Sequence, residues 1–595
     1  MAVEDTKAPE APALPTLEEM QQWTWVMGRA QQMMLEHVAK AMGEAKIPQM
    51  GAVEPKAPQL PWLNMFADPA KIAEQQADLW TQGLAIWQRA LGGEAPRTGL
   101  AEKADKDKRF AAAQWRDNPL FDMIRQSYLL VSERLLGSVD TLEGVDPKQR
   151  EKLRFATRNF VDAMAPSNFA ATNPLVLERA MATKGESLLK GLEHMLQDIS
   201  KGQLTHTDPE AFEVGRNIAV TPGKVVKRTP LYELIQYSPT TDDVHETPLI
   251  IFPPWINRFY ILDLNPKKSF IRWAVEQGLT VFVVSWKSAD ETLVETTLDD
   301  YVLRGQVDAI DTVRALLGVE SVHAIGYCVA GTTLAATLAL LEARGEAGKV
   351  ASATFFTAQV DFSEAGDLNL FVADETLQLI DQISADKGYL DGRYMAATFN
   401  MLRGRDLIWS YVTNNYLMGE DYAPFDLLHW NSDTTNLPAK WHQAYLKDFY
   451  RDNKLVRAGE LVVDGTPIDI RKVKTPTYVQ AGREDHIAPA ASVWKITHYF
   501  QGPMRFVLAG SGHIAGVVNP PEAGKYQYWT NDDKPATLDE FVAGATEHKG
   551  SWWPDWVKWI GALDEKKVPA KGARIPGKGR LKAIEDAPGS YVKAK

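Results

Sequence analysis

The chain has 595 residues, more than a single hydrophobic core usually organises, so two or three domains are expected. Hydrophobic residues make up 45% and charged residues 24%, a composition that is typical of folded globular proteins and argues against wholesale disorder. The formal net charge of -12 at pH 7 argues against a general affinity for nucleic acid.

The first residues form neither the basic nor the apolar region of an export signal, and residues 1–15 are rich in Ala and Pro, which predicts disorder. No stretch approaches the eighteen consecutive apolar residues of a transmembrane helix. A single cysteine cannot form an internal disulfide. These features together predict a cytoplasmic protein.

The N-terminal third shows helical patterning. Thr16 to Glu19 fits a capping box, and apolar residues then recur every three or four positions. That stripe fits either packing on the rest of the protein or docking to a partner or apolar surface, and both readings stay open. A second helix is expected after Asp68-Pro69, carrying Trp80 and Trp87. We predict a mostly helical domain over residues 1–205. The residues of the first stripe are Met20, Trp23, Met27, Ala30, Met34, Val38 and Ala41.

From about residue 245, short β-branched apolar runs alternate with helical segments, which indicates a mostly parallel sheet with helices on both faces. We therefore predict an α/β catalytic domain over residues 206–595. The expected strands are PLIIF (248–252), TVFVVSW (280–286), SVHAIGY (321–327), SATFF (352–356), PTYVQAG (476–482) and RFVLAG (505–510).

About 115 residues separate the fourth and fifth of these strands, and they are rich in aromatic and turn residues. An insertion of this length inside an α/β sheet is expected to form a cap, or lid, over the C-terminal edge of the strands, where ligands bind in such folds. We place this cap at about residues 358–474.

The only cysteine, Cys328, lies between an expected strand and an expected helix, within GYCVAG at 326–331. A nucleophile at a tight turn between strand and helix is typical of the nucleophile elbow of α/β-hydrolases. That pattern usually has Gly two residues after the nucleophile, where this chain has Ala330 followed by Gly331. We expect Cys328 to be the nucleophile.

Two later loops complete a catalytic set in the chain order nucleophile, acid, histidine. Asp485 follows the fifth strand and His513 follows the sixth. A histidine has to take the thiol proton, because a free thiol of pKa about 8.5 is mostly neutral at pH 7, and a carboxylate has to orient that imidazole. His486 as the base and Glu484 as the acid remain alternatives.

Two backbone amides are candidates for stabilising an oxyanion. The amide of Val329 directly follows the nucleophile, and that of Ile256, or of a neighbour, follows the first strand of the sheet. His323 lies within a strand and is expected to be a core residue with its hydrogen bonds satisfied.

With these residues in view, the chain resembles the class I polyhydroxyalkanoate synthases from about residue 107 to its C-terminus. Each shared stretch is weak alone, but the stretches are specific together and in order. They are DKRF (107–110) with Trp115, Asn168-Phe169, TNP (172–174), PPWINRFYILDLNP (253–266), VSWKS (284–288), GYCVAGT (326–332), LRGRDLIWSYV (402–412), FDLLHWNSDTTNLP (425–438), REDHI (483–487), SGHIAGVVNPP (511–521) and GSWWPDW (550–556).

The resemblance implies an α/β-hydrolase core that polymerises (R)-3-hydroxyacyl-CoA, generally with short side chains such as 3-hydroxybutyryl, and releases CoA. The family's acylated cysteine matches Cys328, its aspartate matches Asp485 and its histidine matches His513. No cofactor and no metal are expected. Homodimerisation, residence at intracellular polymer granules and contact with granule-coat proteins (phasins) are also implied. Whether one or two active sites elongate the chain, and whether Asp485 acts on the hydroxyl itself, stays open.

Two other functions are alternatives to polymerisation. A cysteine hydrolase of the thioesterase or dienelactone hydrolase type shares the elbow and the three catalytic residue types, but it needs neither a helical third nor a large insertion. A non-catalytic granule-binding protein has no reason to keep all three residue types in register.

Two further features have open readings. Residues 565–595 hold nine Lys/Arg against three Asp/Glu, which we interpret as a solvated, flexible end. Four tryptophans near the C-terminus suit either contact with a granule surface or ordinary helix packing. They are Trp552, Trp553, Trp556 and Trp559.

Overall fold

The computed structural model describes residues 29, 33, 81–90, 99–142, 144–533 and 535–594. The expected disorder of residues 1–15, the capping box at Thr16, the first apolar stripe and the start of the second helix lie outside these residues. Trp87 lies in a helix over residues 81–90 and is exposed. No helix among the described residues is long and apolar enough to cross a membrane.

The described part of residues 99–201 is helical, as the sequence predicts. Three of its helices begin with proline directly after a capping residue, Asn118, Asp146 or Asn173, whose side chain accepts a hydrogen bond from a backbone amide of the first turn. The helices are α3 (Gly99–Lys106), α4 (Ala113–Asp117), α5 (Pro119–Asp140), α6 (Pro147–Ala163), α7 (Pro174–Ala182) and α8 (Glu186–Lys201).

The chain divides into two compact units. The helical unit comprises Met1–Thr205 together with Arg403–Tyr422, and the catalytic unit comprises His206–Leu402 and Ala423–Lys595. Within the helical unit, Tyr416 donates its hydroxyl to Asp198 at 2.7 Å, and a side chain at Gly191 would collide with the Tyr416 carbonyl oxygen. Part of the insertion that we assigned to a cap therefore packs with the helices of the N-terminal third.

The catalytic unit contains an eleven-stranded sheet in the order β15-β14-β13-β12-β7-β6-β4-β5-β2-β1-β17. The six consecutive strands from β13 to β5 are parallel, and antiparallel strands extend both edges. All six predicted strands are confirmed: β4 (Leu249–Phe252), β5 (Val281–Trp286), β6 (Val322–Tyr327), β7 (Val350–Phe356), β12 (Thr477–Gly482) and β13 (Met504–Ala509). The edge strands are β1 (Gly223–Arg228), β2 (Tyr232–Tyr237), β14 (Gln527–Thr530), β15 (Thr546–Lys549) and β17 (Glu585–Asp586).

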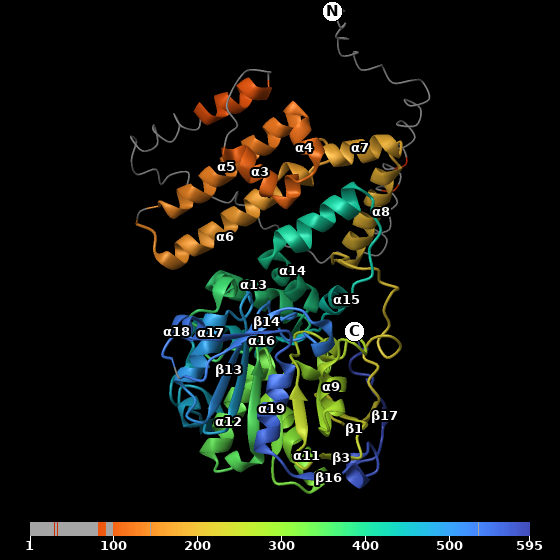
Figure 1. The fold of residues 1–595 in the computed structure, drawn as a ribbon, viewed down its shortest axis with the longest axis vertical. Coiled ribbons are helices and arrows are strands. Elements are labelled where there is room, and N and C mark those ends of the chain that lie inside the picture. The colour runs from red at the N-terminus through yellow and green to blue at the C-terminus, as the bar shows by residue number, and fades with distance from the viewer. Residues whose placement is uncertain are drawn as a thin grey trace, which may run out of the picture. The chain divides into compact units, whose positions relative to one another are not determined.

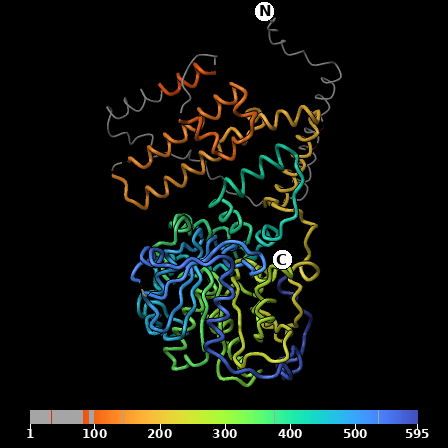
Figure 2. The backbone as a smooth tube through the Cα atoms, viewed as in Figure 1, coloured from red at the N-terminus to blue at the C-terminus, as the bar shows by residue number. Residues whose placement is uncertain are grey.

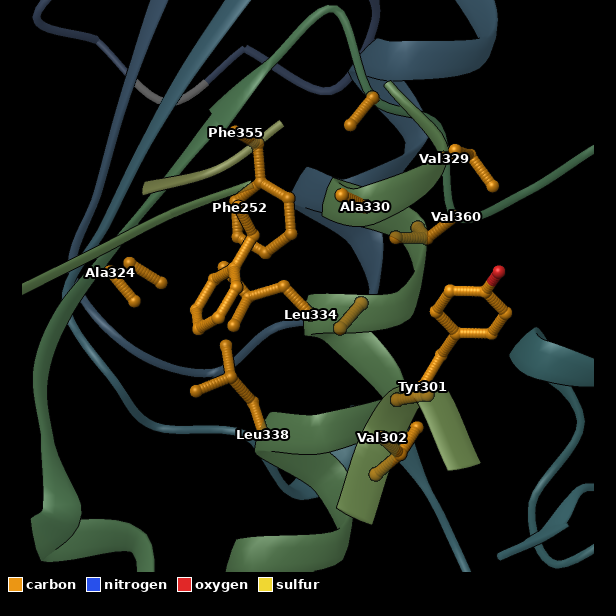
Figure 3. Packing of buried hydrophobic residues seen from close by; sticks show 14 of the residues in the cluster. Phe252, Tyr301, Val302, Ala324, Val329, Ala330, Leu334, Leu338, Phe355 and Val360 are labelled. Atoms are coloured by element: carbon orange, nitrogen blue, oxygen red, sulfur yellow. The ribbon is translucent and has the colours of Figure 1, made fainter. Parts of the chain in front are cut away.

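Helices cover both faces of this sheet, which confirms the α/β fold class (Figure 1). One face packs against α11 (Asp308–Leu317) and α12 (Val329–Ala343), and the other packs against α9 (Phe270–Glu276) and α19 (Trp553–Leu563). Figure 3 shows Leu334 and Leu338 of α12 directed toward Phe252 and Phe355 of the sheet. α12 is buried on nearly all sides, because its sequence is apolar throughout rather than along one stripe.

The insertion after β7 is built from short helices and two small strand pairs. Its helices in the catalytic unit are α13 (Asp374–Ala385), α14 (Gly392–Leu402), α15 (Asp426–Ser432), α16 (Ala439–Ala444) and a π-helix over Tyr445–Arg451. The strand pairs join β8 (Tyr389–Leu390) to β9 (Leu437–Pro438) and β10 (Val462–Val463) to β11 (Thr466–Pro467).

The prediction of a flexible basic end is wrong for the described part of the C-terminal tail. β17 pairs with β1 at the edge of the sheet, and Figure 2 shows this blue segment running beside the yellow strand. The amides of Ser590 and Tyr591 donate hydrogen bonds to the buried carboxylate of Glu233. Arg258 donates to two tail carbonyls. Composition alone could not reveal these partners, since they lie more than 300 residues away in the chain.

The tryptophan cluster is part of the core. Trp552, Trp553 and Trp556 are fully buried, and the latter two contact Phe270 on the same face of the sheet. Their indole nitrogens donate to Gly516, Val517 and Thr354. Helix packing is therefore the correct reading for these three residues.

Candidate active site

Cys328 lies at a sharp turn between β6 and α12. Its backbone has φ 53° and ψ −127°, a conformation that L-residues rarely adopt. The turn is held from both sides, because the Cys328 amide donates to the carbonyl of Phe356 on β7 and the Thr332 amide donates to the Cys328 carbonyl. Strain of this kind at the junction of strand and helix is the geometry of a nucleophile elbow. The thiol is partly exposed.

Close packing under the elbow depends on two glycines. A Cβ at Gly326 would lie 2.5 Å from the Cα of Gly331, and a Cβ at Gly331 would lie 2.4 Å from the Cβ of Ala358. Ala330 is fully buried, and its carbonyl accepts a hydrogen bond from Gln306. The departure of this chain from the usual motif is therefore accommodated, because the close approach of helix and strand occurs at Gly331.

Replacing Gly326 with alanine is expected to destabilise the fold by about 2 kcal/mol or more, since the added methyl group meets backbone atoms that cannot move aside. The midpoint of thermal unfolding should fall by several degrees. Gly348→Ala is the matched control, because nothing lies within 4 Å of the added methyl group there. Equal midpoints for the two variants would contradict the tight packing of the elbow.

His513 and Asp485 meet as predicted from chain order. His513 Nδ1 lies 2.7 Å from Asp485 Oδ2, and both residues are buried. The other carboxylate oxygen, Oδ1, accepts from the amides of Ile487 and Ala488. The Tyr327 hydroxyl donates to the His513 carbonyl at 3.0 Å and so ties the histidine loop to the strand that carries the elbow. Sequence analysis did not anticipate this role of Tyr327.

Electrostatics favour the protonated form of His513. Burial alone would lower its pKa, but the charges of Asp485 and Cys328 and hydrogen bonds to both outweigh burial and raise the pKa to about 10. The His513 imidazole thus lies between the carboxylate of Asp485 and the thiol of Cys328, the only cysteine in the chain. This arrangement places a protonated imidazole beside the thiol of Cys328, a setting that suits a cysteine nucleophile.

The alternative residues are placed less favourably for catalysis. His486 adjoins Asp485 in the chain, but the carboxylate oxygen that faces an imidazole is bonded to His513. Glu484 is exposed. His323 is buried and bonded through Nδ1 to the Ser352 hydroxyl, and burial lowers its pKa to about 4, which keeps it neutral. The prediction that His323 is a satisfied core residue is confirmed.

The two amides predicted to stabilise an oxyanion belong to Val329 and Ile256. Val329 is the first residue of α12, so its N–H belongs to the unpaired first turn of a helix. Ile256 follows β4 in the loop of residues 253–258, and β4 lies next to β6 in the sheet. Among the described residues, neither the Val329 amide nor the Ile256 amide donates a hydrogen bond to another group.

Aromatic residues of the insertion lie near the thiol. Burial is the largest cause that raises the pKa of Tyr445 and of Tyr450, both on the π-helix Tyr445–Arg451, and the charge of Cys328 is a smaller cause in the same direction. Tyr445 stacks on Trp441 at 5.1 Å, and Trp441 contacts Trp255 beside Ile256. Within the described residues, no group of three or more metal-ligating side chains comes together.

Two family models match this chain. Residues 106–274 match a family model described as the N-terminus of poly-beta-hydroxybutyrate polymerase (PhaC), and residues 248–520 match one described as the alpha/beta hydrolase fold. A poly(3-hydroxyalkanoate) polymerase of Methylorubrum extorquens is 46% identical over 541 residues, which cover 90% of this chain and 88% of the relative.

Two polymerase subunits are similar to a comparable degree. The poly(3-hydroxyalkanoate) polymerase subunit PhaC of Rhizobium meliloti is 45% identical over 90% of this chain and 87% of its own length. The subunit of the same name from Cupriavidus necator is 43% identical over 89% of each chain. Identity of this extent along nearly the whole length confirms the resemblance, and the chain therefore belongs to the poly(3-hydroxyalkanoate) polymerase family, with an alpha/beta-hydrolase fold.

Proposed function

We propose that this protein polymerises (R)-3-hydroxyacyl-CoA thioesters into a polyester and releases CoA, with Cys328 as the nucleophile that carries the growing acyl chain. The observation that carries the proposal is the bonded pair of His513 and Asp485 beside the only thiol, at a strained elbow. Short side chains, as in 3-hydroxybutyryl-CoA, are the substrate class that we assign.

In the first step, the Cys328 thiolate attacks the thioester carbonyl carbon, and the negative charge moves to the carbonyl oxygen. The Val329 and Ile256 amides stabilise that oxygen. The carbon–sulfur bond to CoA then breaks, and the proton on His513 goes to the departing sulfur. One thioester replaces another, so the acyl-enzyme keeps enough activation for the next transfer.

In the second step, neutral His513 accepts the proton of a 3-hydroxyl group on another acyl unit. The oxygen attacks the acyl-Cys328 carbonyl, an ester bond forms, and the Cys328 thiolate leaves. Asp485 holds His513 through Nδ1, which leaves Nε2 to exchange protons. Water has to be kept from the acyl-enzyme, and the aromatic residues of the insertion are suited to exclude it.

Product analysis tests this proposal directly. Purified protein is incubated with (R)-3-hydroxybutyryl-CoA while free CoA is followed, and the organic-soluble product is analysed by mass, in parallel with Cys328→Ser. We expect CoA release with a high-mass polyester from the wild type and neither from the variant. Release of free 3-hydroxybutyrate alone would instead indicate a thioesterase, and CoA release that survives in Cys328→Ser would remove Cys328 from the mechanism.

Further parts of the proposal concern organisation. We assign residues 1–205 to a helical domain and residues 206–595 to the catalytic domain, except for Arg403–Tyr422, which belongs to the helical unit. The insertion at about 358–474 is assigned to a cap that closes over the acyl-enzyme. The names of the relatives, which are poly(3-hydroxyalkanoate) polymerases, support residence at polyester granules. Homodimerisation and contact with granule-coat proteins are further properties to test. Size measurement in solution and localisation of a labelled chain in polymer-accumulating cells address them.

A further inference from the structure

Residues 433–438, which we call the strap, follow α15 and return to the loop of residues 253–258. An antiparallel bridge joins Thr434 of the strap to Asn257 of the loop. The hydroxyl of Thr435 donates to the carbonyl oxygen of Trp255 at 2.6 Å. Both residues of this hydrogen bond are buried. The strap therefore contacts the loop at the residue directly before Ile256.

This hydrogen bond matters because its acceptor is the carbonyl oxygen of Trp255. The Trp255 carbonyl and the Ile256 amide belong to the same peptide unit, which is planar and trans, so the C=O and the N–H point in opposite directions. A hydrogen bond to the carbonyl oxygen consequently fixes the direction of the N–H. It also polarises the peptide unit and makes its N–H a better donor.

The strap is itself held firmly. Asn436 exchanges backbone and side-chain hydrogen bonds with Ala289, since its carbonyl accepts from the Ala289 amide at 3.1 Å and its Nδ2 donates to the Ala289 carbonyl at 3.1 Å. The Asn436 amide donates to the Ser288 hydroxyl at 3.0 Å. On the other side, a Cβ at Gly392 would lie 2.4 Å from the Thr435 carbonyl oxygen. The Thr435 hydroxyl is thus presented by a backbone with little freedom to move.

We propose that Thr435 is a positioning residue of the oxyanion hole, whose hydroxyl orients the Trp255–Ile256 peptide so that the Ile256 amide faces the acyl oxygen on Cys328. This inference rests on the proposed function, which gives the Ile256 amide that role. Thr435 touches neither substrate nor sulfur in this mechanism, and it acts only through the peptide that it binds.

The test compares two reactions of the same thiol in Thr435→Val, which keeps the shape of the side chain and removes the hydroxyl. Acylation is measured in a single turnover as CoA release from (R)-3-hydroxybutyryl-CoA with enzyme in excess. Alkylation is measured with iodoacetamide, which needs the thiolate but forms no oxyanion. We expect acylation to slow about 10-fold, less than the 10²–10³-fold that follows loss of a donor, while alkylation is unchanged.

Two companion variants complete the design. Thr435→Ser restores the hydroxyl and should restore most of the acylation rate. Thr434→Val is the matched control, because the Thr434 hydroxyl makes no hydrogen bond to any described residue. Its acylation should equal that of the wild type.

Three outcomes overturn the inference: wild-type acylation in Thr435→Val, an equal loss of acylation and alkylation, or no rescue by serine. An equal loss would mean that the thiol and His513 are disturbed rather than the oxyanion hole. Failure of the wild type to be acylated at all would instead overturn the proposed function, so the two failures are distinguishable.

Discussion

Replacing His513 with glutamine is expected to lower the rate of CoA release by about 10⁴-fold or more while leaving the fold intact. Glutamine can keep a hydrogen bond to Asp485, but it cannot take a proton from the thiol or return one to CoA. Acylation and elongation both pass through this imidazole in the proposed mechanism, so both steps should fail. Steady-state CoA release and polymer mass are the measurements, with the far-ultraviolet circular dichroism spectrum as the check on folding.

The control for this prediction is His486→Gln, which changes the neighbouring histidine and should leave turnover within a few-fold of the wild type. If His486→Gln lost activity and His513→Gln retained it, the base would be His486, and the bonded geometry of His513 with Asp485 would have another purpose.

The second large effect is expected for Asp485→Asn, with a loss of roughly 10³–10⁴-fold in CoA release. The amides of Ile487 and Ala488 donate to Asp485 Oδ1, so they will select the carbonyl oxygen of the new amide. Its NH₂ group must then face His513 Nδ1. That nitrogen becomes an acceptor, the proton resides on Nε2, and the imidazole can no longer accept the thiol proton.

The same substitution is also expected to change the pKa of His513 in a definite direction. Removing the negative charge of Asp485 takes away a cause that raises the pKa of His513, so the pKa should fall. Titration of the His513 ring by NMR measures it, and Glu484→Gln, an exposed neighbour, is the control. An unchanged pKa together with full activity would exclude Asp485 as the partner of the base.

The sequence predicted the parts of the fold that depend on local pattern. β6 and β12 are buried on both faces. Such strands need continuous runs of apolar or β-branched residues, which can be recognised in the sequence alone. The order of Cys328, Asp485 and His513 was informative for the same reason, since each follows a recognisable strand. β14 and β15 lack such a pattern, because most of their residues are partly or fully exposed.

The remaining features depend on contacts between distant residues. Thr435 lies 180 residues from the peptide that it binds, and nothing in the letters DTTNLP reveals this partner. The ordered tail depends on Glu233 and Arg258, whose charges give no hint of backbone partners near residue 590. Propensity and periodicity describe residues that are neighbours in the chain, whereas these hydrogen bonds join residues that only folding brings together.

The membership of Arg403–Tyr422 in the helical unit affects how the protein can be divided. A cut at residue 205 would leave this segment in the catalytic fragment but remove Asp162 and Asp198, which bind Arg405 and Tyr416. It would also remove the backbone of α8 that lies against Tyr416 and Gly419. The shortened chain would keep the twenty residues Arg403–Tyr422 without the helices that they pack against. A truncated enzyme would therefore differ from the full chain at its insertion as well as at its N-terminus.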